Sequence, residues 1–92
     1  AGADAVCIVG PEAGGHPGNA ALGCMVVAPL ARRQLAVPLV IGGGIGTGES
    51  ILAALASGAD GVVMGSRLLA AEEVWAHPEY KRRVIAAGQD ST

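Results

Sequence analysis

A glycine-rich segment is the first part of this 92-residue sequence that could do chemistry. Residues 42–48 read Gly-Gly-Gly-Ile-Gly-Thr-Gly, between an aliphatic run and a stretch with helical spacing. Glycines at such a junction let backbone N–H groups approach a ligand closely, and the start of the following helix favours an anion. Phosphate is therefore the expected ligand, and a tight turn between a strand and a helix, with no ligand, is the alternative.

This segment matches neither of the common nucleotide-binding loops. From Gly43 to Ser50 it has the spacing of a P-loop, but Glu49 stands where that loop needs a lysine. A glutamate there would repel phosphate. The dinucleotide-binding pattern G-x-G-x-x-G is broken too, because Thr47 occupies the position of the third glycine. The sequence thus predicts a phosphate loop of another kind.

A second candidate loop, Gly65-Ser66-Arg67, follows the next aliphatic run. Gly65 and the N–H and hydroxyl groups of Ser66 could hold the same phosphate from the other side. Barrels of eight βα units commonly build a phosphate site from the loops after two consecutive strands. For Arg67 we expect no contact with a ligand but a surface ion pair with Glu72 or Glu73.

A third loop carries a histidine and follows the first aliphatic run. Residues 10–18 read Gly-Pro-Glu-Ala-Gly-Gly-His-Pro-Gly. Ligands bind at the carboxyl ends of parallel strands, where His16 could act as a base or an acid near neutral pH. The alternative is a loop histidine with no role. Glu12 could orient His16, but we expect it to face solvent.

The remaining histidine and the cysteines predict no metal site and no disulfide. His77 precedes Pro78 at the start of an expected helix, so a surface or capping position is favoured. Its distance from His16 in the sequence is not typical of metal ligands. Cys7 and Cys24 lie in apolar surroundings, where we expect both to pack as small hydrophobic side chains.

The composition excludes several classes of protein. The net charge is −2 and aromatic residues make up only 2% of the chain, so the sequence lacks both the basic excess and the stacking surfaces of a nucleic-acid binder. The apolar stretch 20–31 is too short to cross a membrane. The chain opens without the features of a signal peptide, and its free cysteines suit a reducing compartment, so a cytoplasmic location is expected.

Three short runs rich in Val and Ile predict strands. They cover Asp4–Val9, Val37–Ile41 and Gly61–Met64, and each is followed by glycine. None alternates polar with apolar residues, which favours strands buried on both faces, as in parallel sheets. Two helices are expected between the strands. The first covers Ala21–Leu35 with a break at Pro29, and the second covers Glu49–Ser57, with Thr47 as its N-cap and Gly58 after its end. A third helix is expected after the last strand, over Glu79–Ala87. This order predicts an α/β fold.

A partial internal repeat suggests that the chain belongs to a larger domain. Gly2-Ala3-Asp4-Ala5-Val6 matches Gly58-Ala59-Asp60-Gly61-Val62. In the second copy the glycine ends a helix and the strand follows after a turn. The first copy has the same Gly-Ala-Asp start but only Ala1 before it. We therefore expect it to follow a helix outside this sequence.

Taken together, the three loops resemble one family, the FMN-dependent nitronate monooxygenases and the related FMN-dependent enoyl-ACP reductases. Residues 12–18 are similar to the signature E-[AS]-G-G-H-x-G, and residues 37–45 resemble the family segment P-V-I-A-A-G-G-I. Residues 53–62 are nearly identical to the corresponding family segment. Met64-Gly65-Ser66-Arg67 resembles the family motif M-G-T-R, and residues 77–81 resemble the family segment after the last barrel strand. The resemblance runs almost from end to end, and the Gly-Gly-His loop is its most specific part.

The resemblance implies a fold and a set of roles. Residues 1–92 would be the C-terminal portion of a single FMN-binding TIM-barrel domain. They would supply the last three βα units of the (βα)8 barrel, with parallel strands. His16 would be the catalytic base or would orient the substrate. The cofactor-binding residues would be Gly43, Gly44, Gly65 and Ser66 at the FMN phosphate, and Gly14 and Gly15 near the ring or the ribityl chain.

The expected activity is the oxidation of alkyl nitronates with O2 to a carbonyl compound and nitrite, and the expected partner is this small-molecule substrate. Reduction of an enoyl-ACP thioester is the close alternative. Two further alternatives stay open: a barrel that binds a phosphate ligand without flavin, similar to IMP dehydrogenase, and an inactive truncated piece. Because a complete barrel needs about 250 residues, exposed strand edges could also pair copies of this chain into a homo-oligomer.

Overall fold

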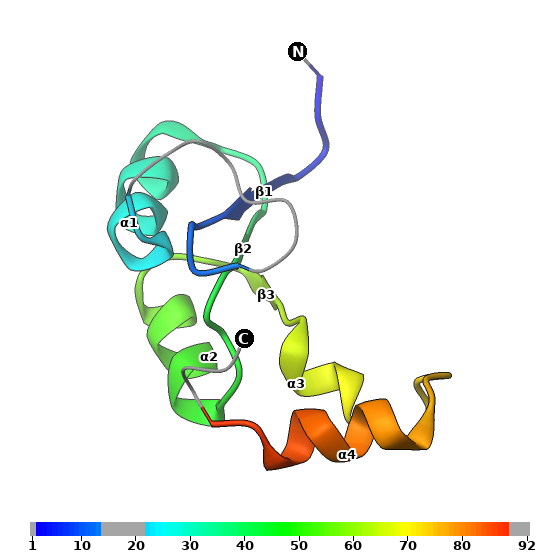
Figure 1. Ribbon diagram of the computed structural model, residues 1–92. Helices are drawn as coiled ribbons and strands as arrows, with labels where there is room; N and C mark the ends of the chain where they lie inside the picture. The colour runs from blue at the N-terminus through cyan, green and yellow to red at the C-terminus, as the bar shows by residue number, and fades with distance from the viewer. Residues whose placement is uncertain (1, 14–21, 89–92) are drawn as a thin grey trace.

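The computed structural model describes residues 2–13 and 22–88, in which three strands and four helices follow one another. Figure 1 shows the sheet at the centre, with α1 and α2 on one side of it and α3 and α4 beyond the strand ends. Every described strand is followed by a helix in the chain. The expected α/β class is therefore confirmed.

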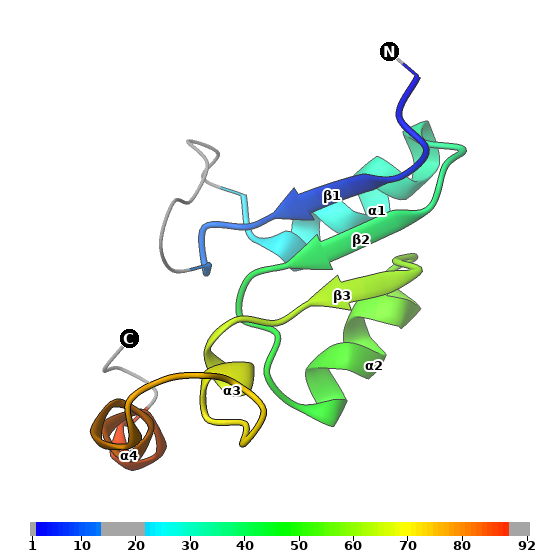
Figure 2. The same cartoon turned by 90° about the vertical axis from the view of Figure 1, so that its right-hand side faces the viewer.

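The three strands form one parallel sheet in the order β1-β2-β3. They cover β1 (Val6–Val9), β2 (Leu39–Gly42) and β3 (Gly61–Val63). Figure 2 shows all three arrows pointing the same way, so their carboxyl ends meet at one edge. The first two strands begin two residues later than predicted. Pro38 accepts a hydrogen bond from the Val6 N–H through its carbonyl, but it has no N–H with which to extend the ladder.

The helices α1 (Cys24–Gln34) and α2 (Gly48–Ala56) cover one face of the sheet. Leu39 and Ile41 point to this face and are fully buried. Ile8 and Val62, from the flanking strands, pack against the same cluster. The buried core consists of Cys24, Ala28, Leu39, Ile41, Ile45, Ala54 and Ala59.

The opposite face of the sheet is apolar and exposed in the described chain. Cys7 is exposed there, and Val9 and Val63 each keep 45% of their surface accessible. The expectation that Cys7 packs as a buried side chain is therefore wrong for this chain, whereas Cys24 is buried as expected. The strands have two apolar faces, as their composition predicted, but the described helices cover only one.

Helix α1 runs without a break through Pro29. The predicted interruption is wrong, because the ring of proline fixes a φ value that a helix also uses. The missing N–H costs one hydrogen bond within the helix, but burial of Cys24 and Ala28 against the sheet holds the two halves in line. Arg32 and Arg33 lie in its last turn, where positive charge is favourable.

The ends of α2 follow the sequence prediction closely. The Thr47 hydroxyl accepts a hydrogen bond from the Ser50 N–H, and the Ser50 hydroxyl accepts one from the Thr47 N–H. This reciprocal pair is a capping box. After the helix, Gly58 has a φ of 107°, a left-handed conformation that glycine adopts without strain. Both predicted caps are confirmed.

Two helices follow β3. The short helix α3 (Ser66–Leu69) was not predicted, and α4 (Pro78–Ala86) matches the expected last helix within a residue at each end. His77 caps α4, because its Nδ1 accepts a hydrogen bond from the Glu79 N–H at 3.1 Å. The favoured capping position of His77 is confirmed. Within residues 2–13 and 22–88, no helix combines the length and the apolar character needed to cross a lipid bilayer.

Candidate functional site: a pocket at the carboxyl ends of the strands

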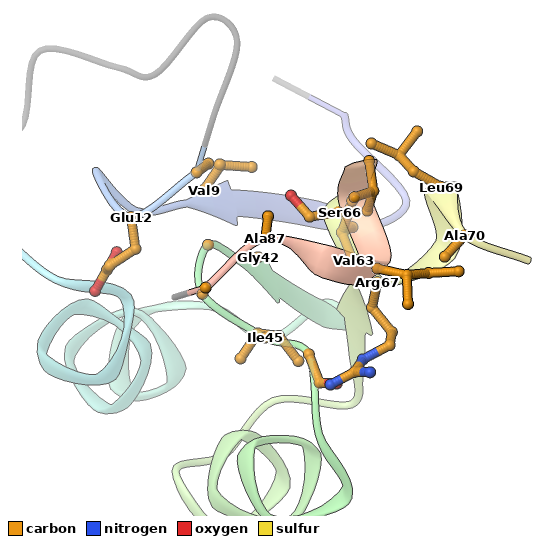
Figure 3. Close-up of a pocket in the computed structure, with 18 residues that line it drawn as sticks. Val9, Glu12, Gly42, Ile45, Val63, Ser66, Arg67, Leu69, Ala70 and Ala87 are labelled. Carbon is orange, nitrogen blue, oxygen red and sulfur yellow. The ribbon is translucent and has the colours of Figure 1, made fainter. Parts of the chain in front are cut away.

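A pocket of about 830 Å³ opens where the loops after all three strands meet. Figure 3 shows Val9 and Glu12 on one side of it, Ser66 on the other, and Gly42 and Ile45 below. The end of α4 closes a further side. The described lining residues are Val9, Glu12, Ala13, Gly42–Gly46, Val63, Gly65–Arg67, Leu69, Ala70, Val84, Ile85, Ala87 and Gly88.

Two consecutive glycines turn the chain after β2 into the pocket. Gly43 and Gly44 have φ values of 106° and 70°, which side-chain-bearing residues rarely adopt. A Cβ at Gly43 would lie 3.1 Å from the Gly10 nitrogen, and one at Gly44 would lie 3.3 Å from the Glu12 Cβ. Cys24 donates a hydrogen bond through Sγ to the Gly43 carbonyl at 3.2 Å. The backbone here lies against its neighbours and its shape is fixed.

Ile45 anchors this loop in the core, while Gly44 before it is exposed and Gly46 after it is half-buried. Only 6% of its surface is accessible. The N–H groups of Gly43, Gly44 and Ile45 have no hydrogen-bond partner among residues 2–13 and 22–88. Because unpaired backbone N–H groups are strong donors, this run can accept the oxygens of an anion.

The start of α2, in contrast, is occupied by its own side chains. The N–H groups of Gly46 and Thr47 both donate to the Ser50 hydroxyl, at 3.1 and 2.9 Å. Hydrogen bonds from its own N–H and from Thr47 lower the pKa of the Glu49 carboxyl, so this carboxylate stays charged at the helix start. The donors at Gly46 and Thr47 are therefore paired with a side chain of α2, whereas those at residues 43–45 have no partner in the described part of the chain.

The loop after β3 faces this run across the pocket. A Cβ at Gly65 would find no atom within 4 Å, so there is open space above its backbone. Ser66 begins α3 and lines the pocket. The structure thus brings together four of the predicted cofactor-binding residues: Gly43, Gly44, Gly65 and Ser66.

Arg67 does not make the expected ion pair. The ion pairs among the described residues include neither Glu72 nor Glu73 as its partner. Instead, its Nε donates a hydrogen bond to the Gly46 carbonyl at 2.7 Å. A charged donor to a carbonyl at this distance is a strong contact. Arg67 therefore joins the loop after β3 to the loop after β2.

Glu12 has a partner that the sequence did not suggest. Although the residue is exposed overall, both carboxylate oxygens accept hydrogen bonds from the Cys24 N–H, at 3.2 and 3.4 Å. The N-cap of α1 is Gly23, which has no side chain to accept this donor. Burial and the nearby Glu12 charge raise the pKa of the Cys24 thiol, which keeps it neutral. Glu12 is thus exposed, as expected, and in addition accepts a hydrogen bond from the first residue of α1.

Gly14, Gly15 and His16 lie outside the described residues, so the structure does not test their predicted roles. The chain enters this segment from the pocket wall, because Ala13 lines the pocket. The α4 side of the pocket, with Val84, Ile85 and Ala87, was missed by sequence reasoning. No short-range pattern could have revealed it, because it depends on how α4 packs. Over the described ranges, no three potential ligands gather as they would around a metal ion.

Comparison with known proteins explains why these loops occur together. The family model for nitronate monooxygenase matches residues 1–92. The chain belongs to the nitronate monooxygenase family. A relative in Bacillus subtilis, named a probable nitronate monooxygenase, is 38% identical over 99% of this chain and 28% of its own length. The chain therefore spans about a quarter to a third of the relatives it matches.

Two other proteins that are similar to this chain have different names. A (3aS,4S,5R,7aS)-5-hydroxy-7a-methyl-1-oxo-octahydro-1H-indene-4-carboxyl-CoA dehydrogenase from Rhodococcus jostii is 40% identical over 99% of the chain and 26% of the relative. The solved structure of FabK from Thermotoga maritima superposes with a TM-score of 0.85 and 39% identity, covering 95% of this chain and 27% of FabK. With the parallel sheet, this likeness identifies the chain as part of a (βα)8 barrel.

Proposed function

We propose that the complete protein containing this chain is an FMN-dependent oxidoreductase that oxidises alkyl nitronates. In this proposal residues 1–92 form the C-terminal portion of a single barrel domain. The observation that carries it is the pocket, where a run of N–H groups without partners among the described residues faces Gly65 and Ser66. Membership of the nitronate monooxygenase family over the whole chain supports the choice of reaction.

The described residues fit a flavin phosphate. Gly43 and Gly44 present their N–H groups, the space above Gly65 is open, and Ser66 adds a hydroxyl. Val9, Val63 and the α4 residues give the rest of the pocket apolar walls, against which a flat ring can pack. When bound, FMN would supply the electron transfer, and the residues of the pocket would hold and orient it.

We assign the proton-handling role to His16, with Gly14 and Gly15 beside the flavin. This rests on the resemblance of residues 12–18 and on the position of Ala13, which lines the pocket three residues before His16. A histidine beside the substrate can hold or accept a proton near neutral pH. Replacement of His16 with Asn should lower turnover about 100-fold, the lower range for loss of general acid–base catalysis, and leave FMN bound. Unchanged turnover would remove His16 from the mechanism.

Purification of the complete protein tests the cofactor and the reaction together. We expect a yellow protein with flavin absorbance that consumes O2 and releases nitrite when an alkyl nitronate is added. A colourless protein that does not take up added FMN would overturn the proposal. It would favour a barrel for a phosphate ligand other than flavin. A flavoprotein that produces no nitrite would refute the nitronate substrate alone.

Reduction of an enoyl thioester is the second candidate, favoured by the likeness to FabK and to a dehydrogenase named for a CoA substrate. The same protein should then oxidise NADH or NADPH only when a 2-enoyl-ACP or 2-enoyl-CoA is present. The two activities are compared on one preparation. Nitrite release without thioester-dependent oxidation of NAD(P)H would leave the nitronate reaction as the function.

The chain of 92 residues by itself is expected to be inactive. Its β1 edge and the apolar face with Cys7 and Val9 are open, so copies can associate through them. Sedimentation at several concentrations measures this association, and a folded monomer at every concentration would contradict it. We also place the protein in the cytoplasm, where its two free cysteines stay reduced. Cell fractionation tests the location.

A further inference from the structure

The peptide groups around Gly46 are held from two directions by side chains that belong to different elements. The Gly46 N–H donates to the Ser50 hydroxyl of α2 at 3.1 Å. Its carbonyl accepts from the Nε of Arg67, in α3, at 2.7 Å. Gly46 directly follows the run 43–45, whose N–H groups have no partner in the part of the chain that the structure describes. Any shift of Gly46 would therefore move these donors.

Arg67 reaches Gly46 from the opposite loop. Figure 3 shows Ser66 and Arg67 leaving α3 in different directions, with the Arg67 guanidinium beside the segment of Ile45. Glycine has no side chain to limit its backbone, and a Cβ at Gly46 would touch only the Arg67 Cβ, at 4.0 Å. The conformation at Gly46 thus depends on its two hydrogen bonds more than on packing.

We propose that Arg67 is a positioning residue for the phosphate group of the ligand. Through the Gly46 carbonyl it fixes the spacing between the donors at 43–45 and those at Gly65 and Ser66, so that both loops bind one phosphate. This inference rests on the proposed phosphate site, and it assigns to Arg67 a role through the backbone rather than a direct contact with the ligand. Ser50 is the second anchor of the same peptide segment.

The test compares FMN with riboflavin, which has the same ring and ribityl chain but no phosphate. Dissociation constants are measured by fluorescence titration of the apo form of the complete protein. Arg67→Met should weaken FMN binding about ten-fold, the loss expected when one backbone hydrogen bond to the charged phosphate is displaced. Riboflavin binding should change by less than about two-fold, because the ring end of the site is unaffected. Arg33→Met is the matched control, since Arg33 is exposed and carries the same charge.

A double-mutant cycle separates positioning through Gly46 from direct attraction of the phosphate. Ser50→Ala should weaken FMN binding about five-fold, because it frees the Gly46 N–H, and the loss of the α2 cap is measured separately by thermal unfolding. If both side chains act on Gly46, the double variant should lose about ten-fold. Independent effects would multiply to about fifty-fold.

Each outcome has one meaning. Multiplicative losses, an Arg67→Met variant with unchanged FMN affinity, or equal losses for FMN and riboflavin would overturn the role of Arg67. Loss of FMN affinity in Arg33→Met to the same extent would show that only net charge matters, and would overturn it as well. A wild-type protein that binds FMN no better than riboflavin would instead refute the proposed phosphate site.

Discussion

The two copies of the Gly-Ala-Asp repeat both begin with a glycine of positive φ but have different surroundings. Gly2 and Gly58 both adopt positive φ values, 82° and 107°. Around the second copy, Asp60 accepts hydrogen bonds from the Leu39 N–H and from Arg32, both at 2.9 Å. Arg32 also lies directly over Gly58. Asp60 therefore links the start of β3 to the start of β2 and to the end of α1 through hydrogen bonds.

The first copy has none of these contacts within the described chain. No atom lies within 4 Å of a Cβ placed on Gly2, and Asp4 is exposed. Ala3 is exposed as well, whereas Ala59 keeps only 6% of its surface accessible. The difference teaches what the second copy does: it joins β3 to the βα unit before it. We propose that the first copy would make the same contacts with a preceding βα unit in the complete protein.

Replacement of the two glycines should give the largest contrast. Gly58→Ala forces a side chain into a left-handed conformation and brings its Cβ to 2.7 Å from the Arg32 Cγ. We expect it to lower the free energy of unfolding by about 2 kcal/mol. Gly2→Ala, near a free end that can relax, should cost less than about 0.5 kcal/mol in the 92-residue chain. Urea denaturation measures both, and equal losses would contradict the comparison.

Replacement of Asp4 and Asp60 should give a smaller difference in the free energy of unfolding, and this difference should depend on whether the 92-residue chain or the complete protein is measured. Asp60→Ala leaves the N–H of the buried Leu39 without its acceptor, which should cost about 1 to 2 kcal/mol. Asp4→Ala should cost almost nothing in the 92-residue chain. In the complete protein, where a preceding strand would supply a similar N–H, the two losses should converge. If Asp4→Ala is still silent there, the two copies do not share one role.

The two adjacent arginines of α1 should give the smallest contrast. Arg32 binds Asp60 and also donates to the carbonyls of Leu35 and Val37, so Arg32→Met should cost about 1 kcal/mol. Arg33→Met, at an exposed position with no such contacts in the described residues, should cost less than about 0.5 kcal/mol. Thermal unfolding measures the difference. A greater loss for Arg33 would show that Arg32 does not stabilise the second copy.

Sequence reasoning predicted what depends on neighbours along the chain. The aliphatic runs, the Thr47 cap and the glycine after α2 were recognisable because a few adjacent residues determine them. The grouping of Gly43 and Gly44 with Gly65 and Ser66 followed from one further rule, that parallel strands end at the same edge. These parts of the fold were correct, and the four residues line one pocket, while their binding of a cofactor stays a prediction.

Contacts between distant residues were not predictable in the same way. Arg67 has acidic residues nearby in the sequence but binds the carbonyl of Gly46, 21 positions earlier. Glu12 caps a helix that starts 12 residues later. The continuity of α1 through Pro29 depends on packing against the sheet, which outweighs the local cost of proline. The exposure of Cys7 depends on which face the helices cover.

The burial of Ile45 has a consequence for the kinetics of binding. Because this side chain sits in the core, the loop that carries the free donors has its shape before any ligand arrives. Association then needs no slow refolding of the loop, and little conformational entropy is lost on capture. Differences in affinity among phosphate ligands should accordingly reside in their dissociation rates. A stopped-flow comparison would show similar association rates for FMN and for smaller phosphates, with residence times that differ widely.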